Sequence, residues 1–291
     1  MLTNGQSKSF AVSDFNGDGK PDLAFTDIIT NDVDVVLNQG GGTFGAPIPY
    51  AVGGFPDSVA VGDFDGDGKP DLAVANGTGN TVSVLLNAGG GTFQAQVTYA
   101  VANRPEQLAV GDFDGNGKPD LAVVNGSGNT VSVLLNQGTG TFGAAATYGV
   151  GANPISLNVG DLNGDGKSDL AVVNLNDDTV SVLLAQAGGT FANQVTYAVG
   201  PLSASLTFLQ PALGDFNGDG KPDLAVPNYG SGTVGVLLNQ GSGTFAAPVT
   251  YAVGKDADSV AVADFNGDGR LDLAVHDVFD ATVKVLLNQC P

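Results

Sequence analysis

The stretch Asp14-Phe15-Asn16-Gly17-Asp18-Gly19-Lys20-Pro21-Asp22 decides the fold, because close copies of it recur along the chain. Six copies are present, beginning at Asp14, Asp63, Asp112, Asp161, Asp215 and Asp264. Each has oxygen-bearing side chains at positions one, three, five and nine, glycine at position six and lysine or arginine at position seven. Alternate residues of a tight loop can turn such oxygens inward around a hard cation, and the glycine permits the sharp bend. The pattern therefore predicts a calcium loop in each repeat.

The predicted ligands are the four oxygen-bearing side chains of each loop and the backbone carbonyl of position seven. About six Ca²⁺ ions, one per repeat, are therefore expected as cofactors. An isolated acidic turn would be explained by solvation alone, but six matching copies argue against that reading. The predicted ligand set is Asp14, Asn16, Asp18, Lys20, Asp22, Asp63, Asp65, Asp67, Lys69, Asp71, Asp112, Asp114, Asn116, Lys118, Asp120, Asp161, Asn163, Asp165, Lys167, Asp169, Asp215, Asn217, Asp219, Lys221, Asp223, Asp264, Asn266, Asp268, Arg270 and Asp272.

The charge of the chain supports this assignment. The formal net charge is −20, and the six loops hold 19 of the 30 acidic residues. Six dications would reduce the net charge to about −8, which is ordinary for a protein surface. The ten basic residues form no patch, so nucleic acid is not expected as a partner.

Other function classes find little support in the composition. The lone cysteine, Cys290, excludes a disulfide framework and a thiolate metal site. No apolar run is long enough for a membrane helix, and the residues after Met1 do not read as a signal peptide. Because calcium sites of modest affinity suit calcium-rich surroundings, we expect a secreted or cell-surface protein.

The spacing of the loops predicts the architecture. Successive loops begin 49 residues apart, except for one interval of 54 residues, and such a period is typical of a propeller blade. In the second repeat, strand-like segments cover 58–62, 71–75, 81–86 and 96–101, separated by turns rich in glycine. No helical periodicity competes with them. The sequence therefore predicts an all-β chain of four-stranded antiparallel blades, with the first strand innermost and the fourth outermost.

Recurring aromatic residues suggest how the blades pack. Phenylalanine occupies loop position two in every repeat except the fourth, and another phenylalanine ends each Gly-Thr-Phe link before the fourth strand. We expect both sets to fill the space between neighbouring blades.

The segment Ser58–Val74, preceded by Thr43–Pro47, resembles the FG-GAP repeat, which is integrin-alpha-like and is also called VCBS-type. The resemblance covers essentially the whole chain and implies a calcium-binding β-propeller whose cations lie opposite its ligand-binding face. The family also includes lectins that hold sugars between blades, and some polysaccharide-degrading enzymes. Such propellers usually have seven blades, whereas this chain has six motifs, and no sugar-binding or ligand-binding motif of the family carries over.

We therefore expect residues 1–291 to form a single β-propeller of six four-stranded blades, the last of them incomplete. The expected blades are 1–53, 54–102, 103–151, 152–200, 201–254 and 255–291. The last repeat lacks a Gly-Thr-Phe link and a fourth strand, so an open blade edge and self-association through it are expected.

Two features opposite the calcium loops are candidates for recognition. The residues 201–210 contain the one insertion, with Leu206, Phe208 and Leu209, and either form a binding bulge or pack on their own blade. The turns after each second strand begin with Asp or Asn, which either form a polar ring for a sugar or an ion, or initiate their turns. These residues are Asp27, Asn76, Asn125, Asn174, Asn228 and Asp277. Asn76 and Asn125 also begin glycosylation triplets.

Catalysis is not expected, because His276 is the only histidine and no nucleophile–base set can be assembled. The sequence predicts a calcium-stabilised extracellular propeller that recognises carbohydrate or protein without catalysing a reaction. The alternative is a purely structural or designed repeat scaffold that self-assembles through its open blade edge.

Overall fold

The computed structural model describes residues 6–203 and 209–289 of the chain. They form two compact units, the first made of residues 1–112 with 116–148 and the second of residues 113–115 with 149–291. We call these units one and two, and we number the repeats one to six by the ranges given above. Among the described residues, the helix η1 (Gly126–Gly128) is far too short to cross a membrane, and no other helix could do so.

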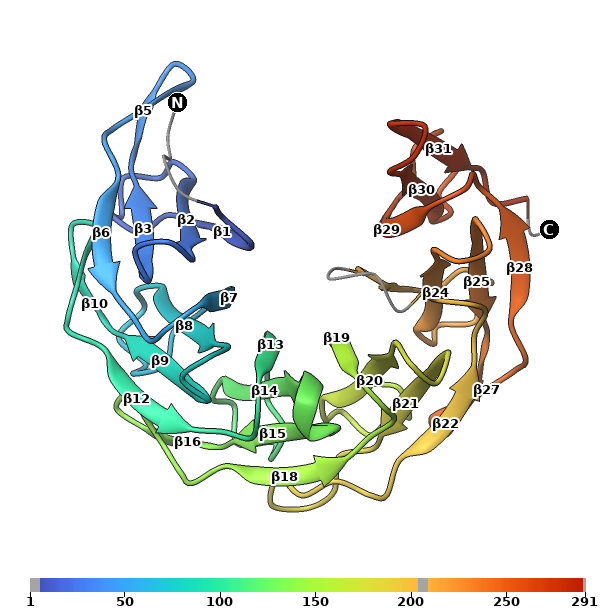
Figure 1. The fold of residues 1–291 in the computed structure, drawn as a ribbon, viewed down its shortest axis with the longest axis horizontal. Helices are drawn as coiled ribbons and strands as arrows, with labels where there is room; N and C mark the ends of the chain where they lie inside the picture. Colours follow the sequence, from blue (N-terminus) through green and yellow to red (C-terminus); the bar gives the residue numbers. More distant parts are fainter. Residues whose placement is uncertain (1–5, 204–208, 290–291) are drawn as a thin grey trace. The chain divides into compact units, whose positions relative to one another are not determined.

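Each repeat builds one antiparallel sheet in simple chain order, as β19-β20-β21-β22 illustrates (Figure 1). The first strands are β1 (Phe10–Ser13), β7 (Pro56–Gly62), β13 (Pro105–Gly111), β19 (Pro154–Gly160), β23 (Ala212–Gly214) and β29 (Ala257–Ala263). The second strands are β2 (Asp22–Asp27), β8 (Asp71–Asn76), β14 (Asp120–Asn125), β20 (Asp169–Asn174), β24 (Asp223–Asn228) and β30 (Asp272–Asp277).

The third and fourth strands complete the sheets. The third strands are β3 (Asp32–Val36), β9 (Thr81–Leu85), β15 (Thr130–Leu134), β21 (Thr179–Leu183), β25 (Thr233–Leu237) and β31 (Thr282–Leu286). The fourth strands are β6 (Ile48–Ala51), β12 (Val97–Ala100), β18 (Ala146–Gly149), β22 (Val195–Ala198) and β28 (Val249–Ala252). Repeat six has three strands among the described residues, so β31 is a sheet edge, as the sequence predicts.

The Gly-Thr-Phe links form small two-stranded ribbons that the sequence reading missed. Each ribbon pairs the residues after a third strand with the Thr-Phe of the link. The ribbons are β4 (Asn38–Gly40) with β5 (Thr43–Phe44), β10 (Asn87–Gly89) with β11 (Thr92–Phe93), β16 (Asn136–Gly138) with β17 (Thr141–Phe142), and β26 (Asn239–Gly241) with β27 (Thr244–Phe245). In repeat four, a single bridge between Ala185 and Phe191 takes the place of a ribbon.

Side chains of neighbouring repeats share each hydrophobic core. In unit one, Phe15 of the first loop packs edge-to-face on Phe93 of the second link, with ring centroids 5.7 Å apart. Phe64 and Phe142 repeat this contact at 5.5 Å. In unit two, Phe245 packs in one core with Leu162, which replaces the loop phenylalanine. The prediction that both aromatic sets fill the space between repeats is confirmed at these contacts, whereas Phe265 of the sixth loop is 48% exposed.

In repeats two, three, five and six, an asparagine after the third strand links the loop of its own repeat to the loop of a preceding repeat. The Asn87 amide donates to the carbonyl of Phe15, in the preceding loop, at 2.9 Å, and to the carbonyl of Pro70, in its own loop, at 3.0 Å. Asn136 and Asn239 make the equivalent bonds, whereas repeat four has Ala185 at this position. A single buried amide thus holds two loops in register.

We expect Asn87→Ala to lower the free energy of unfolding by about 1–3 kcal/mol, because the Pro70 carbonyl loses this donor and the Phe15 carbonyl keeps only the amide of Gly91 as a donor. Urea unfolding followed by circular dichroism measures this difference. Asn38→Ala is the matched control, since the Asn38 amide donates to Pro21 within its own repeat. Equal losses in the two variants would contradict the linking role.

Candidate functional site

Each loop is folded around the carboxylate at position one. In repeat two, Asp63 Oδ1 accepts hydrogen bonds from the amides of Gly66 and Asp67 at 2.9 and 3.1 Å, and Oδ2 accepts one from Gly68 at 2.9 Å. The same three bonds recur around Asp14, Asp161, Asp215 and Asp264. The loop conformation therefore follows from its first residue, which gathers three backbone amides.

Glycine is needed at loop positions four and six because of the backbone conformation. Gly66 and Gly68 have φ values of +78° and +83°, which side-chain-bearing residues rarely adopt. Nothing lies within 4 Å of a Cβ atom built at either position, so space is not the constraint. The sequence reading identified the glycine at position six and overlooked the one at position four.

The aspartate at position nine is the buried one among the predicted ligands of each loop. In all six repeats this residue is fully buried. Asp71 accepts hydrogen bonds from the amide of Phe64 at 2.8 Å and from the amide of Asn87 at 2.7 Å. Burial raises the pKa of Asp71 to about 6, against the lowering effect of these two bonds, and raises that of Asp169 to about 6 in the same way. These carboxylates lie in surroundings that favour either a proton or a nearby cation.

The loops bring together carboxylates that lie apart in the sequence. In repeat two, ligand oxygens of Asp63, Asp65 and Asp71 all lie within 4.8 Å of one another. Asp112, Asp114 and Asp120 form the same cluster in repeat three. These two loops have aspartate at position three, where the other four have asparagine. The oxygen-only donor set fits a hard cation such as Ca²⁺.

The lysine at position seven has a role that the sequence reading did not include. The Lys20 ammonium lies 2.8 Å from Asp18 Oδ2, at position five of the same loop, and Lys221 lies 2.8 Å from Asp219. Lys69 and Asp67 form the same pair. Hydrogen bonding to Lys20 lowers the pKa of Asp18, and hydrogen bonding to Lys69 lowers that of Asp67. In these loops the lysine side chain thus pairs with the aspartate at position five.

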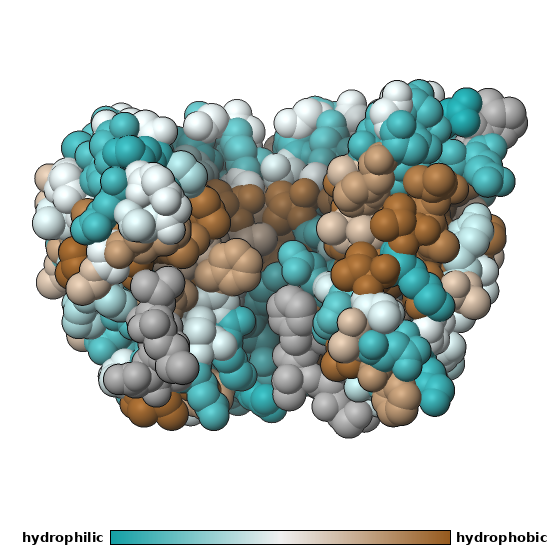
Figure 2. Space-filling view, turned by 90° about the horizontal axis from the view of Figure 1, so that it is seen from above, coloured by the Kyte–Doolittle hydropathy of each residue, from teal (hydrophilic) through white to brown (hydrophobic). Residues whose placement is uncertain are grey.

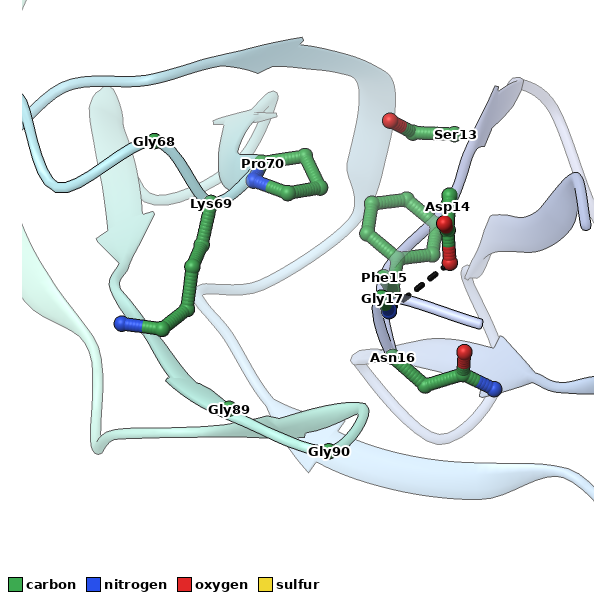
Figure 3. Close-up of a pocket in the computed structure, with 10 residues that line it drawn as sticks. All are labelled: Ser13, Asp14, Phe15, Asn16, Gly17, Gly68, Lys69, Pro70, Gly89 and Gly90. Carbon is green, nitrogen blue, oxygen red and sulfur yellow. Dashed lines mark hydrogen bonds between the residues drawn. The ribbon is translucent and has the colours of Figure 1, made fainter. Parts of the chain in front are cut away.

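A cleft of about 390 Å³ lies between the first two loops (Figure 3). Asp14 and Asn16 line one side, and Lys69, Gly89 and Gly90 line the other. Phe15 also contributes to the lining, but its side chain is buried, so it offers no open face on which a sugar ring could stack. The cleft is therefore a groove beside the loops that is lined by both polar and apolar groups.

The polar ring is not open to a ligand. Asn76, Asn125, Asn174, Asn228 and Asp277 are fully buried, and Asp27 is nearly so. The Asn76 amide donates to Thr81 and Ser83 in the next strand, and Asp27 accepts from the amides of Ile29 and Thr30 in its own turn. The reading of these residues as a sugar or ion site is therefore wrong. Burial also keeps Asn76 and Asn125 from acting as glycosylation acceptors in the folded chain.

The insertion in repeat five packs into the core at both described ends. Leu202 and Leu209 are buried in the hydrophobic core of unit two. The backbone amide of Gln210 then donates to the carbonyl of Asp258 at 2.9 Å. Leu206 and Phe208 lie outside the described residues. The described part of the insertion thus packs on its own unit.

A polar and aromatic cluster that sequence reasoning missed lies beside Gln210. His276 Nδ1 lies 2.8 Å from Asp258 Oδ1, and the histidine side chain remains 43% exposed. The Tyr229 hydroxyl lies near Asp256, and burial together with that carboxylate raises the pKa of Tyr229. We call Tyr229, Asp256, Asp258 and His276 the repeat-six cluster.

Departure from the repeat could have revealed this cluster. The residues equivalent to His276 are Thr26, Ala75, Val124, Val173 and Pro227, and those equivalent to Tyr229 are Ile28, Gly77, Gly126, Leu175 and Val278. Phe279, in the adjoining turn, is 62% exposed, and the Lys255 ammonium lies 4.3 Å from the centre of its ring. Histidine, tyrosine and an exposed phenylalanine thus occur together where the repeat ordinarily has small or aliphatic residues.

Solved structures with the same fold include both binding proteins and enzymes. A lectin from Agrocybe aegerita that recognises non-reducing terminal N-acetylglucosamine is 23% identical, with a TM-score of 0.60 over 97% of this chain and 80% of its own. Virginiamycin B lyase from Staphylococcus aureus is 12% identical, with a TM-score of 0.61 over 99% and 87%. A Lactobacillus plantarum protein is 16% identical, with a TM-score of 0.65 over 99% and 86%. The shared fold alone does not decide between binding and catalysis.

The search of curated proteins gave no match. The family described as FG-GAP-like repeat matches five overlapping segments, 14–74, 63–123, 112–172, 161–226 and 215–275. Each segment runs from one predicted calcium loop through the next, so the family match and the loop spacing describe the same repeat. The chain, an all-β protein of repeated four-stranded sheets with propeller-like relatives, belongs to the FG-GAP-like repeat family.

Proposed function

We propose that this chain is a calcium-stabilised, extracellular β-propeller of six blades that recognises carbohydrate or protein and catalyses no reaction. The observation that carries the proposal is the clustering of three loop carboxylates within 4.8 Å in repeats two and three. Like charges at this distance repel one another, and a bound dication would turn that repulsion into attraction. Burial raises the pKa of Asp71, at position nine, to about 6, which adds to the need for a cation.

Calcium would be held by loop positions one, three, five and nine together with the position-seven carbonyl. The bound ion would tie the loop to the start of the second strand, and through Asp71 to the end of the third strand, because Asp71 accepts from the amide of Asn87. The free energy of calcium binding then adds to the free energy of folding, because the unfolded chain has no preformed site.

Removing calcium with a chelator should lower the melting temperature strongly, and added calcium should restore it. At a free concentration one hundred times the dissociation constant, one site adds about 2.7 kcal/mol to the stability, and six sites act together. Differential scanning calorimetry with and without chelator measures the effect. Asp63→Ala should cost less than full chelation, because five loops remain. An unchanged melting temperature in chelator would reject the calcium role.

The second loop should bind calcium most tightly, because it has four carboxylates where the others have three. Isothermal titration calorimetry should show one site of higher affinity, and Asp65→Asn should bring it to the level of the rest. Asn16→Asp is the matched variant that should gain affinity. It gives loop one the same four carboxylates and should create a second tight site. If Asp65→Asn leaves the titration unchanged, carboxylate count does not set the affinity.

The recognition surface that we favour is the repeat-six cluster with the neighbouring Phe279. Aromatic faces and planar polar groups are the side chains that bind sugar rings and their hydroxyl groups, and the same groups anchor protein partners. Asp258 orients His276 through a contact of 2.8 Å, so this polar pair is held before a ligand arrives.

A glycan array, or a pull-down with surface proteins, can identify ligands of the wild type. The Tyr229→Ala and His276→Ala variants should bind these ligands roughly tenfold or more weakly, as expected for loss of an anchoring side chain. Tyr251→Ala is the matched control, because Tyr251 is an exposed tyrosine outside the cluster. Melting temperature shows that each variant is folded. Full binding by both cluster variants would exclude this surface.

A further inference from the structure

Four of the six loops have asparagine at position three, directly before the glycine at position four. The pairs are Asn16-Gly17, Asn163-Gly164, Asn217-Gly218 and Asn266-Gly267. Asparagine loses its side-chain amide most readily before glycine, because glycine has no side chain to hinder attack of its own backbone nitrogen on the carboxamide. We call Asn16, Asn163, Asn217 and Asn266 the loop asparagines.

The loop asparagines lie where water can reach them. Asn266 is exposed and the other three are half-buried, and the glycine after each of them is exposed. Nothing lies within 4 Å of a Cβ atom built on any of these four glycines. In the face drawn in Figure 2, hydrophilic residues lie above and below a band of apolar residues, as expected when the strands supply the cores and the turns and loops at their ends are exposed. The surroundings therefore give these pairs no steric protection.

Hydrogen bonds within the loop hold the two groups that would react. The Gly17 amide donates to Asp14 Oδ1 at 2.8 Å (Figure 3), and Asn16 Oδ1 accepts from the Asp18 amide at 2.8 Å. The same two contacts recur in the other three loops. Asp14 and Asn16 are also predicted calcium ligands, so a bound ion would hold the same two side chains. Without an ion, the carboxylates of the loop repel one another, and local opening frees the Gly17 nitrogen and the Asn16 side chain.

We propose that the loop asparagines deamidate spontaneously and that bound calcium suppresses the reaction. The Gly17 nitrogen gives its proton to base and attacks Cγ of Asn16, forming a new C–N bond. The carboxamide nitrogen takes up a proton and leaves as ammonia, which closes a succinimide ring. Water then adds to either carbonyl group of the ring and breaks a ring C–N bond, giving aspartate or isoaspartate. Water is the one co-reactant, and nothing is oxidised or reduced.

The two products would affect the calcium site in opposite ways. Aspartate already stands at position three of loops two and three, as Asp65 and Asp114, so this product fits the loop and adds a carboxylate ligand. Isoaspartate adds a methylene group to the backbone between positions three and four. In loop one, this displaces the amides of Gly17 and Gly19, which Asp14 gathers. Deamidation therefore strengthens or disrupts the site, according to which carbonyl group water attacks.

Two buried Asn-Gly pairs provide a comparison within the same chain. Asn76 and Asn125, which precede glycine in the turns after the second strands, are fully buried. The Asn76 amide donates to Ser83 at 2.8 Å, and the amide of Gly77 donates to the carbonyl of Phe55 at 2.8 Å. None of these contacts involves a predicted calcium ligand. We therefore expect Asn76 and Asn125 to stay intact in the folded chain, with or without calcium.

Peptide mapping by mass spectrometry, after long incubation of the full chain in mildly alkaline buffer, tests the proposal. Asp18→Ala removes one predicted ligand from loop one and leaves the other five loops unchanged, and it keeps Asp14, the acceptor of the Gly17 amide. In excess calcium, this variant should deamidate at Asn16 severalfold faster than the wild type. Asn163, Asn217 and Asn266 are controls in the same sample, because their loops keep calcium and should react at the wild-type rate.

The calcium part of the proposal rests on the proposed function, and the two can be told apart. Melting temperatures with and without calcium test the calcium role and show that Asp18→Ala is folded. If calcium raises the melting temperature of the wild type but Asn16 reacts equally slowly in the variant and the wild type, the proposal is overturned while the calcium role stands. If calcium changes neither the melting temperature nor any rate, both fail. Loss of the Asn76 or Asn125 amide as fast as that of Asn16 in the folded variant would also overturn the proposal.

Discussion

The buried aspartate at loop position nine is the constraint on which each repeat depends. Its two oxygens accept amides from loop position two and from the residue just after the third strand, as Asp71 does from Phe64 and Asn87. One carboxylate thus fixes the loop, the second strand and the third strand relative to one another. Burying a charge in this way is costly unless it is compensated, and hydrogen bonds alone leave the pKa of Asp71 raised to about 6. Other carboxylates gather nearby in repeat two, and the calcium ion that we propose would supply the compensation.

The repetition of this unit makes departures from it informative. Asn87 and its equivalents join the loops of successive repeats, and loop and link phenylalanines fill the cores between them. Against this regular background, His276, Tyr229 and the exposed Phe279 stand out as side chains that the packing does not require. The exposed valines of β31 stand out in a different way, because identical valines are buried in every other repeat. The first group forms the recognition surface that we propose.

Much of the local structure could be predicted from the sequence because it depends on neighbours in the chain. The loop begins with Asp63, bends at glycines and ends at Asp71, all within nine residues, so its fold follows from short-range hydrogen bonds. The strands follow from β-branched runs between glycine-rich turns. The reading of Asn76 and its equivalents as an open polar ring was wrong, because their burial depends on strands and turns that pack over them. The bond from Asn87 to Phe15 spans 72 residues, and no local pattern revealed it.

The sequence by itself determined the repeat, its all-β character and the residues of each acidic loop, since these rest on periodicity and on side-chain chemistry. Tertiary structure decided which of those residues are buried and what they contact. It placed His276 against Asp258, put Leu202 and Leu209 in the core, and left Phe10 and Val283 in solvent. The physical reason is that burial depends on what packs against a residue from distant parts of the chain. Identical side chains, such as Val234 and Val283, therefore have opposite environments in neighbouring repeats.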